Sequence, residues 1–158
     1  MRISRHQMFM EIACVVSKRS TCFRENVGCI ITRENKIISI GYNGRPSGDP
    51  HCQYHPQGKC TKSIHAESNA IRFLLEGHHS PTKDYNLYVT HLPCVQCTNL
   101  IINSNMIKRV FFQILYGDTE PIYKLLDENN IQLHRILPSG SLTSHDRSEL
   151  YDEIRDNR

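Results

Sequence analysis

The stretch YNLYVTHLPCVQCTNLIINSN, residues 85–105, changes from a strand pattern to a helix pattern at a single proline. The part before this proline is rich in the aromatic and β-branched side chains that strands favour. Pro93 then stands where its fixed φ suits the opening of a helix, and we expect the helix to continue from Cys94. A strand that leads directly into a helix is typical of an α/β domain with crossover connections.

The segments on either side extend this alternation. Hydrophobic spacing and breaker residues predict helices at 5–19, 65–76, 94–105 and 120–130, and strands at 27–32, 36–42, 85–92, 109–115 and 131–136. This order predicts an α/β fold with three α/β/α layers and a central five-stranded mixed sheet that begins with an antiparallel hairpin. We expect residues 1–158 to form a single domain with a polar tail from about residue 138, which contains at most a short helix near 148–155.

Composition and charge narrow the classes of function. Hydrophobic residues make up 39% and charged residues 22% of the chain, as in soluble globular proteins. The sequence contains neither an apolar run of bilayer length nor a signal-peptide pattern, so we expect a cytoplasmic protein without a membrane partner. The net charge of +3, without a long run of like charges, argues against stable nucleic-acid binding and is compatible with a small anionic ligand.

Cysteine and histidine point to a metal site. Seven cysteines are an odd number, which together with the missing secretory signal argues against a complete set of disulfides. Cys94 and Cys97 lie at the start of one predicted helix, and His65 lies at the start of another. Two thiolates and an imidazole suit Zn²⁺ and leave a fourth position open, as catalytic zinc sites do. Glu67 is then a candidate proton shuttle, because it lies two residues from a ligand without having to be one.

The segment between the second predicted strand and the second predicted helix is a long loop. Residues 43–63, NGRPSGDPHCQYHPQGKCTKS, are crowded with glycine, proline and polar residues. A loop of this length without regular structure is usually functional or held by another group. Cys52, His55 and Cys60 lie in it, so a metal could hold the loop in place.

The motifs together resemble a known family. His65-Ala66-Glu67 and Pro93-Cys94-x-x-Cys97 match the H-x-E…P-C-x-x-C signature of zinc-dependent nucleobase deaminases. The stretches KRSTCFRENVGCIIT (18–32), GYNGRPSG (41–48), GKCTKSIHAESNAI (58–71) and LYVTHLPCVQC (87–97) resemble the deoxycytidylate deaminases, over approximately residues 5–115. The resemblance implies a cytidine-deaminase-like fold, which agrees with the layers expected from the pattern.

The resemblance also implies an activity and a set of roles. It implies hydrolysis of dCMP to dUMP and ammonia, which would feed dTMP synthesis, with no organic cofactor. The implied residues are Glu67 as the acid and base, His65, Cys94 and Cys97 as ligands of a catalytic Zn²⁺, Asn43 for the deoxyribose, the Ala66 N–H for the pyrimidine O2, and Arg24 and Asn26 for the 5′-phosphate. Arginine suits a phosphate because its planar fork donates paired, charge-assisted hydrogen bonds.

Two further properties follow from the resemblance. Some members of the resembled family hold their loop with a second, structural Zn²⁺, and here Cys22, Cys52 and Cys60 are the candidate ligands, with His55 as the candidate fourth. Many members are homohexamers that dCTP activates and dTTP inhibits, so we expect a homo-oligomer, with a hexamer favoured. The candidate effector residues are those of the loop Gly41, Tyr42, Asn43, Gly44 and Arg45.

Three other functions stay open at this point. The substrate could be dCTP, or both dCMP and dCTP, since several basic side chains could reach a longer phosphate chain. A tRNA or polynucleotide deaminase shares the zinc signature, although the sequence lacks a basic aromatic groove. A zinc-stabilised binding module without turnover is the third, but such a module has no use for Glu67 beside an open metal position.

Overall fold

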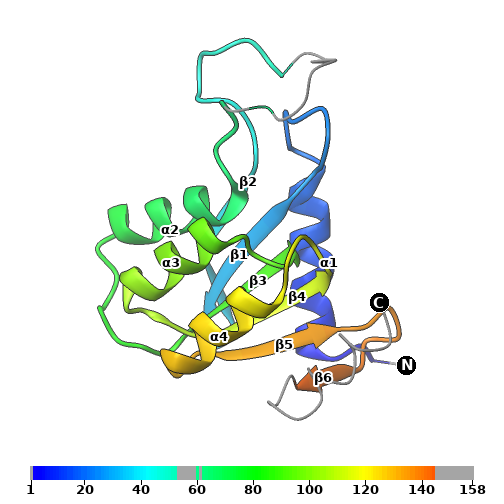
Figure 1. Cartoon of the computed structure of the whole chain (residues 1–158), viewed down its shortest axis with the longest axis vertical. Coiled ribbons are helices and arrows are strands. Elements are labelled where there is room, and N and C mark those ends of the chain that lie inside the picture. The colour runs from blue at the N-terminus through cyan, green and yellow to red at the C-terminus, as the bar shows by residue number, and fades with distance from the viewer. Residues whose placement is uncertain (1, 53–59, 61, 145–158) are drawn as a thin grey trace.

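The computed structural model describes residues 2–52, 60 and 62–144. Its helices are α1 (Arg5–Ser17), α2 (Ala66–Glu76), α3 (Val95–Ser104) and α4 (Glu120–Glu128). Its strands are β1 (Gly28–Arg33), β2 (Lys36–Tyr42), β3 (Tyr85–His91), β4 (Ile107–Ile114), β5 (Gln132–Ile136) and β6 (Leu142–Ser144). The strands form one mixed sheet in the order β2-β1-β3-β4-β5-β6, with helices on both faces (Figure 1). The predicted α/β class, the layers and the opening hairpin are confirmed.

The opening hairpin owes its geometry to two left-handed residues. Arg33 pairs with Lys36, so Glu34 and Asn35 alone form the turn, at φ of 49° and 65°. Positive φ at both central positions is the geometry of a type I′ turn, whose twist matches that of antiparallel strands. Beyond this hairpin β1 also pairs antiparallel with β3, whereas β3, β4 and β5 are mutually parallel.

Two apolar layers cover the two faces of the sheet. On one face, α1 buries Phe9, Met10 and Ala13 against Ile30 of β1 and aromatic residues of β3 and β4. On the other face, α2, α3 and α4 pack over the sheet, and the fully buried side chains there include Ala70, Ile71, Leu74, Leu87, Val89, Ile101, Val110 and Phe112. Figure 1 shows α1 on one side of the sheet and the other three helices on the opposite side. The three-layer arrangement fixes where the ends of α2 and α3 lie.

The predicted number of strands is wrong, because the sheet has six. β6 pairs antiparallel with β5, with Ile136 opposite Leu142. A tight turn produces this pairing: the Leu137 N–H donates to Ser141 O at 2.9 Å, and Gly140 takes a φ of 82°. A three-residue strand with one large apolar side chain has too little pattern to be found in a polar tail. The short helix expected at 148–155 lies outside the described residues.

α2 lies unusually close to β2, and a glycine permits it. A Cβ on Gly41 would come within 2.3 Å of the Ala66 carbonyl oxygen and 2.5 Å of the Ala70 nitrogen. Only a residue without a side chain allows the two backbones to approach this far. The approach places the first turn of α2 over the sheet. Across the described residues, no helix is long and apolar enough to cross a lipid bilayer.

Candidate active site

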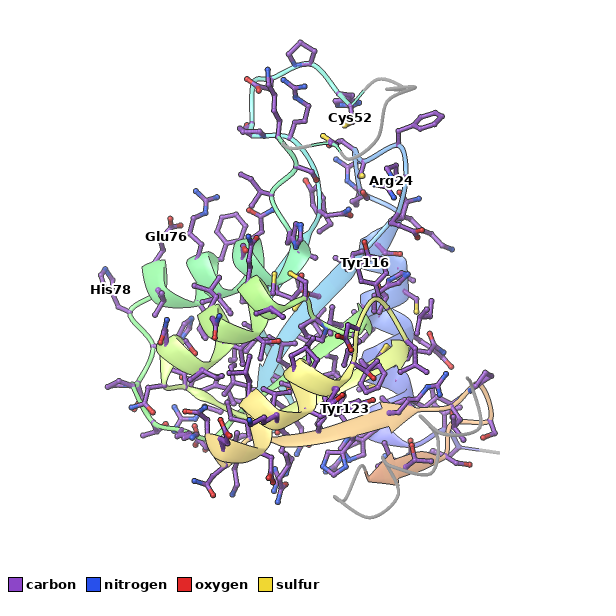
Figure 2. All side chains as sticks on the ribbon, viewed as in Figure 1. Arg24, Cys52, Glu76, His78, Tyr116 and Tyr123 are labelled. Atoms are coloured by element: carbon purple, nitrogen blue, oxygen red, sulfur yellow. The ribbon has the colours of Figure 1, made fainter. Side chains whose placement is uncertain are left out.

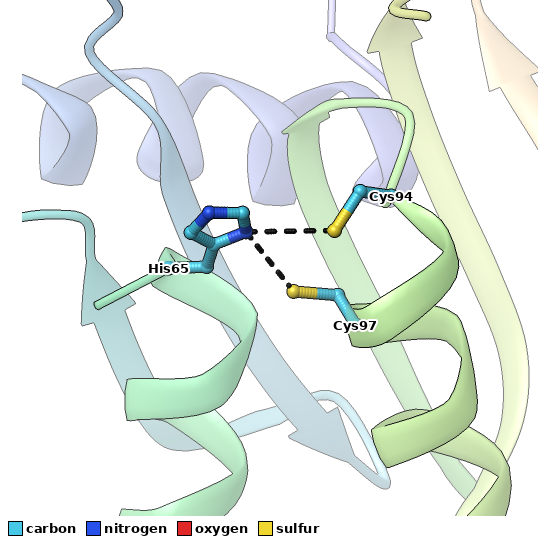
Figure 3. Close-up of side chains that lie close together, drawn as sticks. All are labelled: His65, Cys94 and Cys97. Carbon is cyan, nitrogen blue, oxygen red and sulfur yellow. Dashed lines mark hydrogen bonds between the residues drawn. The ribbon is translucent and has the colours of Figure 1, made fainter. Parts of the chain in front are cut away.

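Two helix N-termini bring three potential metal ligands together. His65 immediately precedes α2, Cys94 immediately precedes α3, and Cys97 lies in the first turn of α3. The His65 Nδ1 atom is 3.6 Å from Cys94 Sγ and 3.3 Å from Cys97 Sγ (Figure 3). The three ligand atoms lie within 4.8 Å of one another, and they form the one such cluster found among the described residues. The sequence prediction that these residues converge is confirmed.

The geometry of this helix-end cluster, His65, Cys94 and Cys97, fits zinc. In a tetrahedral site with ordinary Zn–S and Zn–N bond lengths, a ligand nitrogen and sulfur lie about 3.6 Å apart. The two nitrogen–sulfur distances of 3.6 and 3.3 Å are close to this value. Three ligands leave a fourth position, and the exposure of His65 contrasts with the burial of Cys97. The cluster therefore fits a metal that is open on its outer side.

The two sulfur atoms are chemically unequal without a cation between them. A hydrogen bond from the Cys97 thiol lowers the pKa of Cys94 to about 4, and the same hydrogen bond raises the pKa of Cys97. The hydrogen bond to Cys94 also raises the pKa of His65, more than burial lowers it. The N-terminal ends of α2 and α3 favour negative charge at this point. A bound cation would complete the deprotonation, since thiols bind metals as thiolates.

Glu67 lies beside the cluster on the first turn of α2. Its side chain is only 4% exposed, and burial raises the pKa of its carboxyl group. The nearby Cys94 charge raises this pKa further, whereas His65 and a hydrogen bond from Cys97 oppose the rise. A raised pKa brings a carboxyl group nearer to the condition in which it can both take up and release a proton. The position suits a proton shuttle that does not bind the metal.

The candidate phosphate residues lie on an irregular segment, residues 20–27, between α1 and β1. Arg24 and Asn26 are both exposed there, and Figure 2 shows Arg24 toward the upper end of the molecule, just below Cys52. Ala66, the candidate for the pyrimidine O2, is the first residue of α2, and the first N–H groups of a helix have no acceptor within it.

Asn43 holds this segment in place. Its Oδ1 accepts from the Val27 N–H at 2.8 Å and from Ser20 Oγ at 2.7 Å, and its Nδ2 donates to Glu25 O at 2.7 Å. The side chain is 7% exposed. Asn43, expected from the sequence to contact the deoxyribose, therefore also holds the 20–27 segment by three hydrogen bonds, which the sequence did not reveal.

The other candidate effector residues also have structural contacts. Gly41 lies under α2, and the Tyr42 carbonyl accepts from Asn69 Nδ2 of α2 at 2.9 Å. A Cβ on Gly44 would come within 2.3 Å of Thr21 Oγ1. Arg45 forms an ion pair with Asp49 at 3.1 Å. The segment 41–45 thus joins β2, α2 and the 20–27 segment.

Cys52 and Cys60 are in contact, and Cys22 of the 20–27 segment lies near enough to Cys52 to affect its charge, although the three sulfur atoms do not form a group as tight as the helix-end cluster; we call Cys22, Cys52 and Cys60 the loop cluster. Cys52 Sγ is 2.9 Å from Cys60 Sγ, and the Cys52 N–H donates to Thr21 O at 3.3 Å. The hydrogen bond from Cys52, together with backbone N–H donors at Lys62 and Ser63, lowers the pKa of Cys60. The pKa of Cys52 is raised, first by the same hydrogen bond and also by the nearby Cys22. His55, the candidate fourth ligand, lies outside the described residues.

One group of residues at the site was not found from the sequence. His91 ends β3, and its Nδ1 lies 2.9 Å from Thr90 Oγ1. Its Nε2 lies 3.7 Å from a carboxylate oxygen of Glu25, and its ring meets the Tyr116 ring edge-on at 6.2 Å. Burial lowers the pKa of His91, and Glu25 partly offsets this. A histidine at a strand end, three residues before Cys94, was the available signal.

Comparison with known proteins supports these observations. Residues 3–114 match the family model described as the cytidine and deoxycytidylate deaminase zinc-binding region. The ComE operon protein 2 of Bacillus subtilis is 34% identical over 139 residues, which cover 85% of this chain and 72% of that protein. The deoxycytidylate deaminase of Schizosaccharomyces pombe is 31% identical over 87% of this chain. The chain spans only 45% of the length of that yeast relative.

The fold has a close counterpart among solved structures. The crystal structure of dCMP deaminase from cyanophage S-TIM5, in complex with dCMP and dUMP, superposes with a TM-score of 0.76. Its sequence is 26% identical, and the alignment covers 85% of this chain and 98% of the phage enzyme. The family model matches most of the chain and includes all three residues of the helix-end cluster. This chain belongs to the cytidine and deoxycytidylate deaminase family of zinc-binding proteins.

Proposed function

We propose that this protein is a zinc-dependent hydrolase that converts dCMP to dUMP and ammonia. The observation that carries the proposal is the buried Glu67 carboxyl group beside the helix-end cluster. A purely structural metal site has no use for such a group. The phage enzyme that superposes on this chain was crystallised with dCMP and dUMP, which supports a cytosine deoxynucleotide as the substrate.

His65, Cys94 and Cys97 would hold the zinc ion. When bound, zinc supplies a water molecule that is activated for attack at neutral pH. Glu67 would take one proton from the attacking water and give it to N3 of the cytosine, and would then carry the second proton of the same oxygen to the amino group, which leaves C4 as ammonia while the C4 carbonyl forms. The raised pKa of Glu67 helps the transfer to the amino group, because a carboxyl group of higher pKa keeps its proton more readily between the two transfers.

The substrate is oriented by the backbone and by the 20–27 segment. The Ala66 N–H donates to the pyrimidine O2, and Asn43 contacts the deoxyribose through donor capacity beyond its bond to Glu25. Arg24 and Asn26 bind the 5′-phosphate. Their exposure on one short segment supports this role, because a phosphate dianion needs charged and polar donors that can reach it.

The loop cluster holds a second, structural Zn²⁺ in this proposal. Two thiols 2.9 Å apart, with backbone N–H groups directed at Cys60, resemble the surroundings of metal-bound thiolates. Cys22 supplies the third ligand, and His55 supplies the fourth. Such a metal would fix the loop that leads into His65.

The proposed function includes assembly into an oligomer and regulation by nucleotides. The protein forms a homo-oligomer, with a hexamer favoured, which dCTP activates and dTTP inhibits through residues Gly41, Tyr42, Asn43, Gly44 and Arg45. Support comes from the contacts of Gly41 and Tyr42 with α2, since a ligand that shifts these residues would act on the helix that carries Glu67.

Ammonia release by the zinc-loaded protein tests the activity. Four substrates are compared in parallel: dCMP, dCTP, deoxycytidine and a single-stranded cytosine oligonucleotide. We expect turnover of dCMP, raised by dCTP and lowered by dTTP. Turnover of dCTP alone would replace dCMP as the proposed substrate. Turnover of the oligonucleotide would favour a polynucleotide deaminase, and no ammonia release from any of the four would favour a zinc-stabilised binding module.

A further inference from the structure

His91 links the strand that leads into the metal ligands with the segment that carries Arg24 and Asn26. It is the last residue of β3, and its side chain is 14% exposed. Its two ring nitrogens face different partners: Nδ1 lies 2.9 Å from Thr90 Oγ1, and Nε2 lies 3.7 Å from Glu25 Oε2. The Glu25 contact is within ion-pair distance and longer than a hydrogen bond.

The hydrogen bonds around Thr90 favour one arrangement of the His91 protons. Thr90 Oγ1 accepts from the Gly28 N–H at 3.3 Å, and Thr90 is 3% exposed. The hydroxyl proton can then be donated to His91 Nδ1, which places the imidazole proton on Nε2. This proton points toward the Glu25 carboxylate. The lowered pKa of His91 agrees with a neutral ring near pH 7, whose Nε2–H faces the Glu25 carboxylate across 3.7 Å without a direct hydrogen bond.

Glu25 contacts two residues at strand ends, one through its backbone and one through a side chain that is 55% exposed. Its carbonyl oxygen accepts from Asn43 Nδ2 at 2.7 Å, at the end of β2, and its carboxylate faces His91 at the end of β3. Arg24 and Asn26 are its neighbours in sequence. An untied Glu25 carboxylate would compete with a phosphate for the Arg24 guanidinium, because it carries the same sign of charge.

We propose that His91 is a positioning residue: through Glu25 it ties the 20–27 segment to the end of β3 and so sets where Arg24 and Asn26 meet the nucleotide phosphate. This inference rests on the proposed function, because it assumes a phosphorylated substrate at that segment. His91 itself need not touch the substrate. Its contribution is the direction of the Glu25 carboxylate, away from the place where the phosphate binds.

Kinetics of paired variants test the proposal. In His91→Leu we expect KM for dCMP to rise about fivefold, which corresponds to about 1 kcal/mol, with a smaller change in kcat. The value of kcat/KM for deoxycytidine, which lacks the phosphate, should change less than about twofold. His91→Gln should restore most of the dCMP affinity, because its amide nitrogen can replace Nε2 as a donor. His79→Leu, at an exposed histidine after α2, is the matched control and should behave as wild type.

A double-mutant cycle identifies Glu25 as the partner. Glu25→Ala should raise KM for dCMP by about as much as His91→Leu, and the double variant should add little to either. Additive effects in the cycle, or an equal loss with dCMP and deoxycytidine, would overturn the positioning role.

Hydrogen exchange separates this inference from the proposed function. Peptides that cover residues 20–27 should exchange faster in His91→Leu than in wild type and the His79→Leu control, with the α3 peptides unchanged. Unchanged exchange in the 20–27 peptides would refute the tie, whatever the enzyme does. Wild type could turn over none of the four substrates while the 20–27 peptides still exchange faster in His91→Leu. The proposed function would then fail, but the link between His91 and the 20–27 segment would be supported.

Discussion

The helix-end cluster and the loop cluster each contain two cysteines joined by a hydrogen bond, but different kinds of backbone structure position the two pairs. In each pair one thiol donates a hydrogen bond to the other, so that the pKa of Cys94 and of Cys60 is lowered while that of Cys97 and of Cys52 is raised. Regular helices position the first pair, and irregular segments position the second. Similar thiol chemistry therefore does not imply a similar role.

The surroundings of the two pairs separate their proposed roles. The helix-end cluster has a buried carboxyl group, Glu67, next to it, and its outermost residue, His65, is exposed. The Cys60 sulfur instead accepts backbone N–H groups and lies near the Arg45 charge. An open site with a proton carrier suits turnover, and a closed thiolate site suits the ordering of a loop.

Removing one thiol from each cluster should have different effects on activity, and these are the largest effects that we expect. We expect Cys97→Ser to lose about one zinc ion per chain and all measurable deaminase activity, because the catalytic metal has only three protein ligands. Cys60→Ser should also lose about one zinc ion, keep activity within about threefold of wild type, and lower Tm by about 5 °C. Zinc content, ammonia release and thermal unfolding are measured on the same preparations.

Either of two results would contradict this pair of predictions. Full zinc content in Cys60→Ser would mean that the loop cluster is not a metal site. Loss of activity in Cys60→Ser at unchanged Tm would mean that the loop cluster takes part in turnover directly.

Replacing the proton carrier should leave the metal in place. Glu67→Gln should lower kcat by about 10³-fold, within the range for loss of a general acid and base, with zinc content unchanged. The control is Glu76→Gln on the same helix, an exposed carboxylate 3.8 Å from Arg72. That variant should keep wild-type kcat, since exposed ion pairs contribute little. Substantial turnover by Glu67→Gln would assign the proton transfer to another group.

The contact between α2 and β2 should be sensitive to a single methyl group. In Gly41→Ala the added Cβ would clash with the Ala66 carbonyl oxygen and the Ala70 nitrogen. These are backbone atoms, which cannot relieve the clash by a change of rotamer as a side chain can. We expect a loss of about 1–3 kcal/mol in the free energy of unfolding, and lower activity because the first turn of α2 shifts. Chemical denaturation measures the first effect.

Gly77→Ala is the matched control for this variant. Gly77 has a φ of −74°, and the nearest atoms to an added Cβ belong to the flexible His79 side chain. We therefore expect Gly77→Ala to be close to neutral. Equal destabilisation by the two variants would show that the α2–β2 approach is not especially tight.

The sequence was most informative where regular elements carry the residues. His65, Cys94 and Cys97 lie at predicted helix starts, and helix starts at one edge of an α/β sheet converge for geometric reasons. The order of helices and strands along the chain, and from it the layers on the two faces of the sheet, followed from hydrophobic periodicity in the same way. The convergence of the three candidate ligands could therefore be predicted before any distance was known.

The sequence was least informative where contacts join irregular segments. β6 has too few residues for a periodic signal and depends on the turn at Gly140. The hydrogen bonds of Asn43 and the approach of His91 to Glu25 link residues far apart in the chain. Nothing local to either residue specifies its partner, because such contacts depend on how the 20–27 segment crosses the end of the sheet.

Thiol alkylation should reveal a smaller difference, in the reactivity of the individual cysteines of the two clusters. In metal-free protein we expect Cys94 and then Cys60 to react with iodoacetamide faster than Cys14, since thiolate is the nucleophile. Cys94, with a pKa of about 4, is already deprotonated at neutral pH, so its rate should change little as pH rises. Burial raises the pKa of Cys14, so its rate should increase with pH, by up to about tenfold per pH unit while the thiol remains mostly protonated.

The same alkylation experiment with added zinc tests whether both clusters bind the metal. Mass spectrometry of tryptic peptides follows each cysteine separately. Added zinc should protect Cys94 and Cys60 while Cys14, on the far face of the sheet, reacts as before. Protection of Cys94 without Cys60 would leave the helix-end cluster as the sole metal site of the two, and the paired thiols of the loop cluster would then hold their segment by hydrogen bonds alone, as the contacts of Cys60 with Cys52, Lys62 and Ser63 permit.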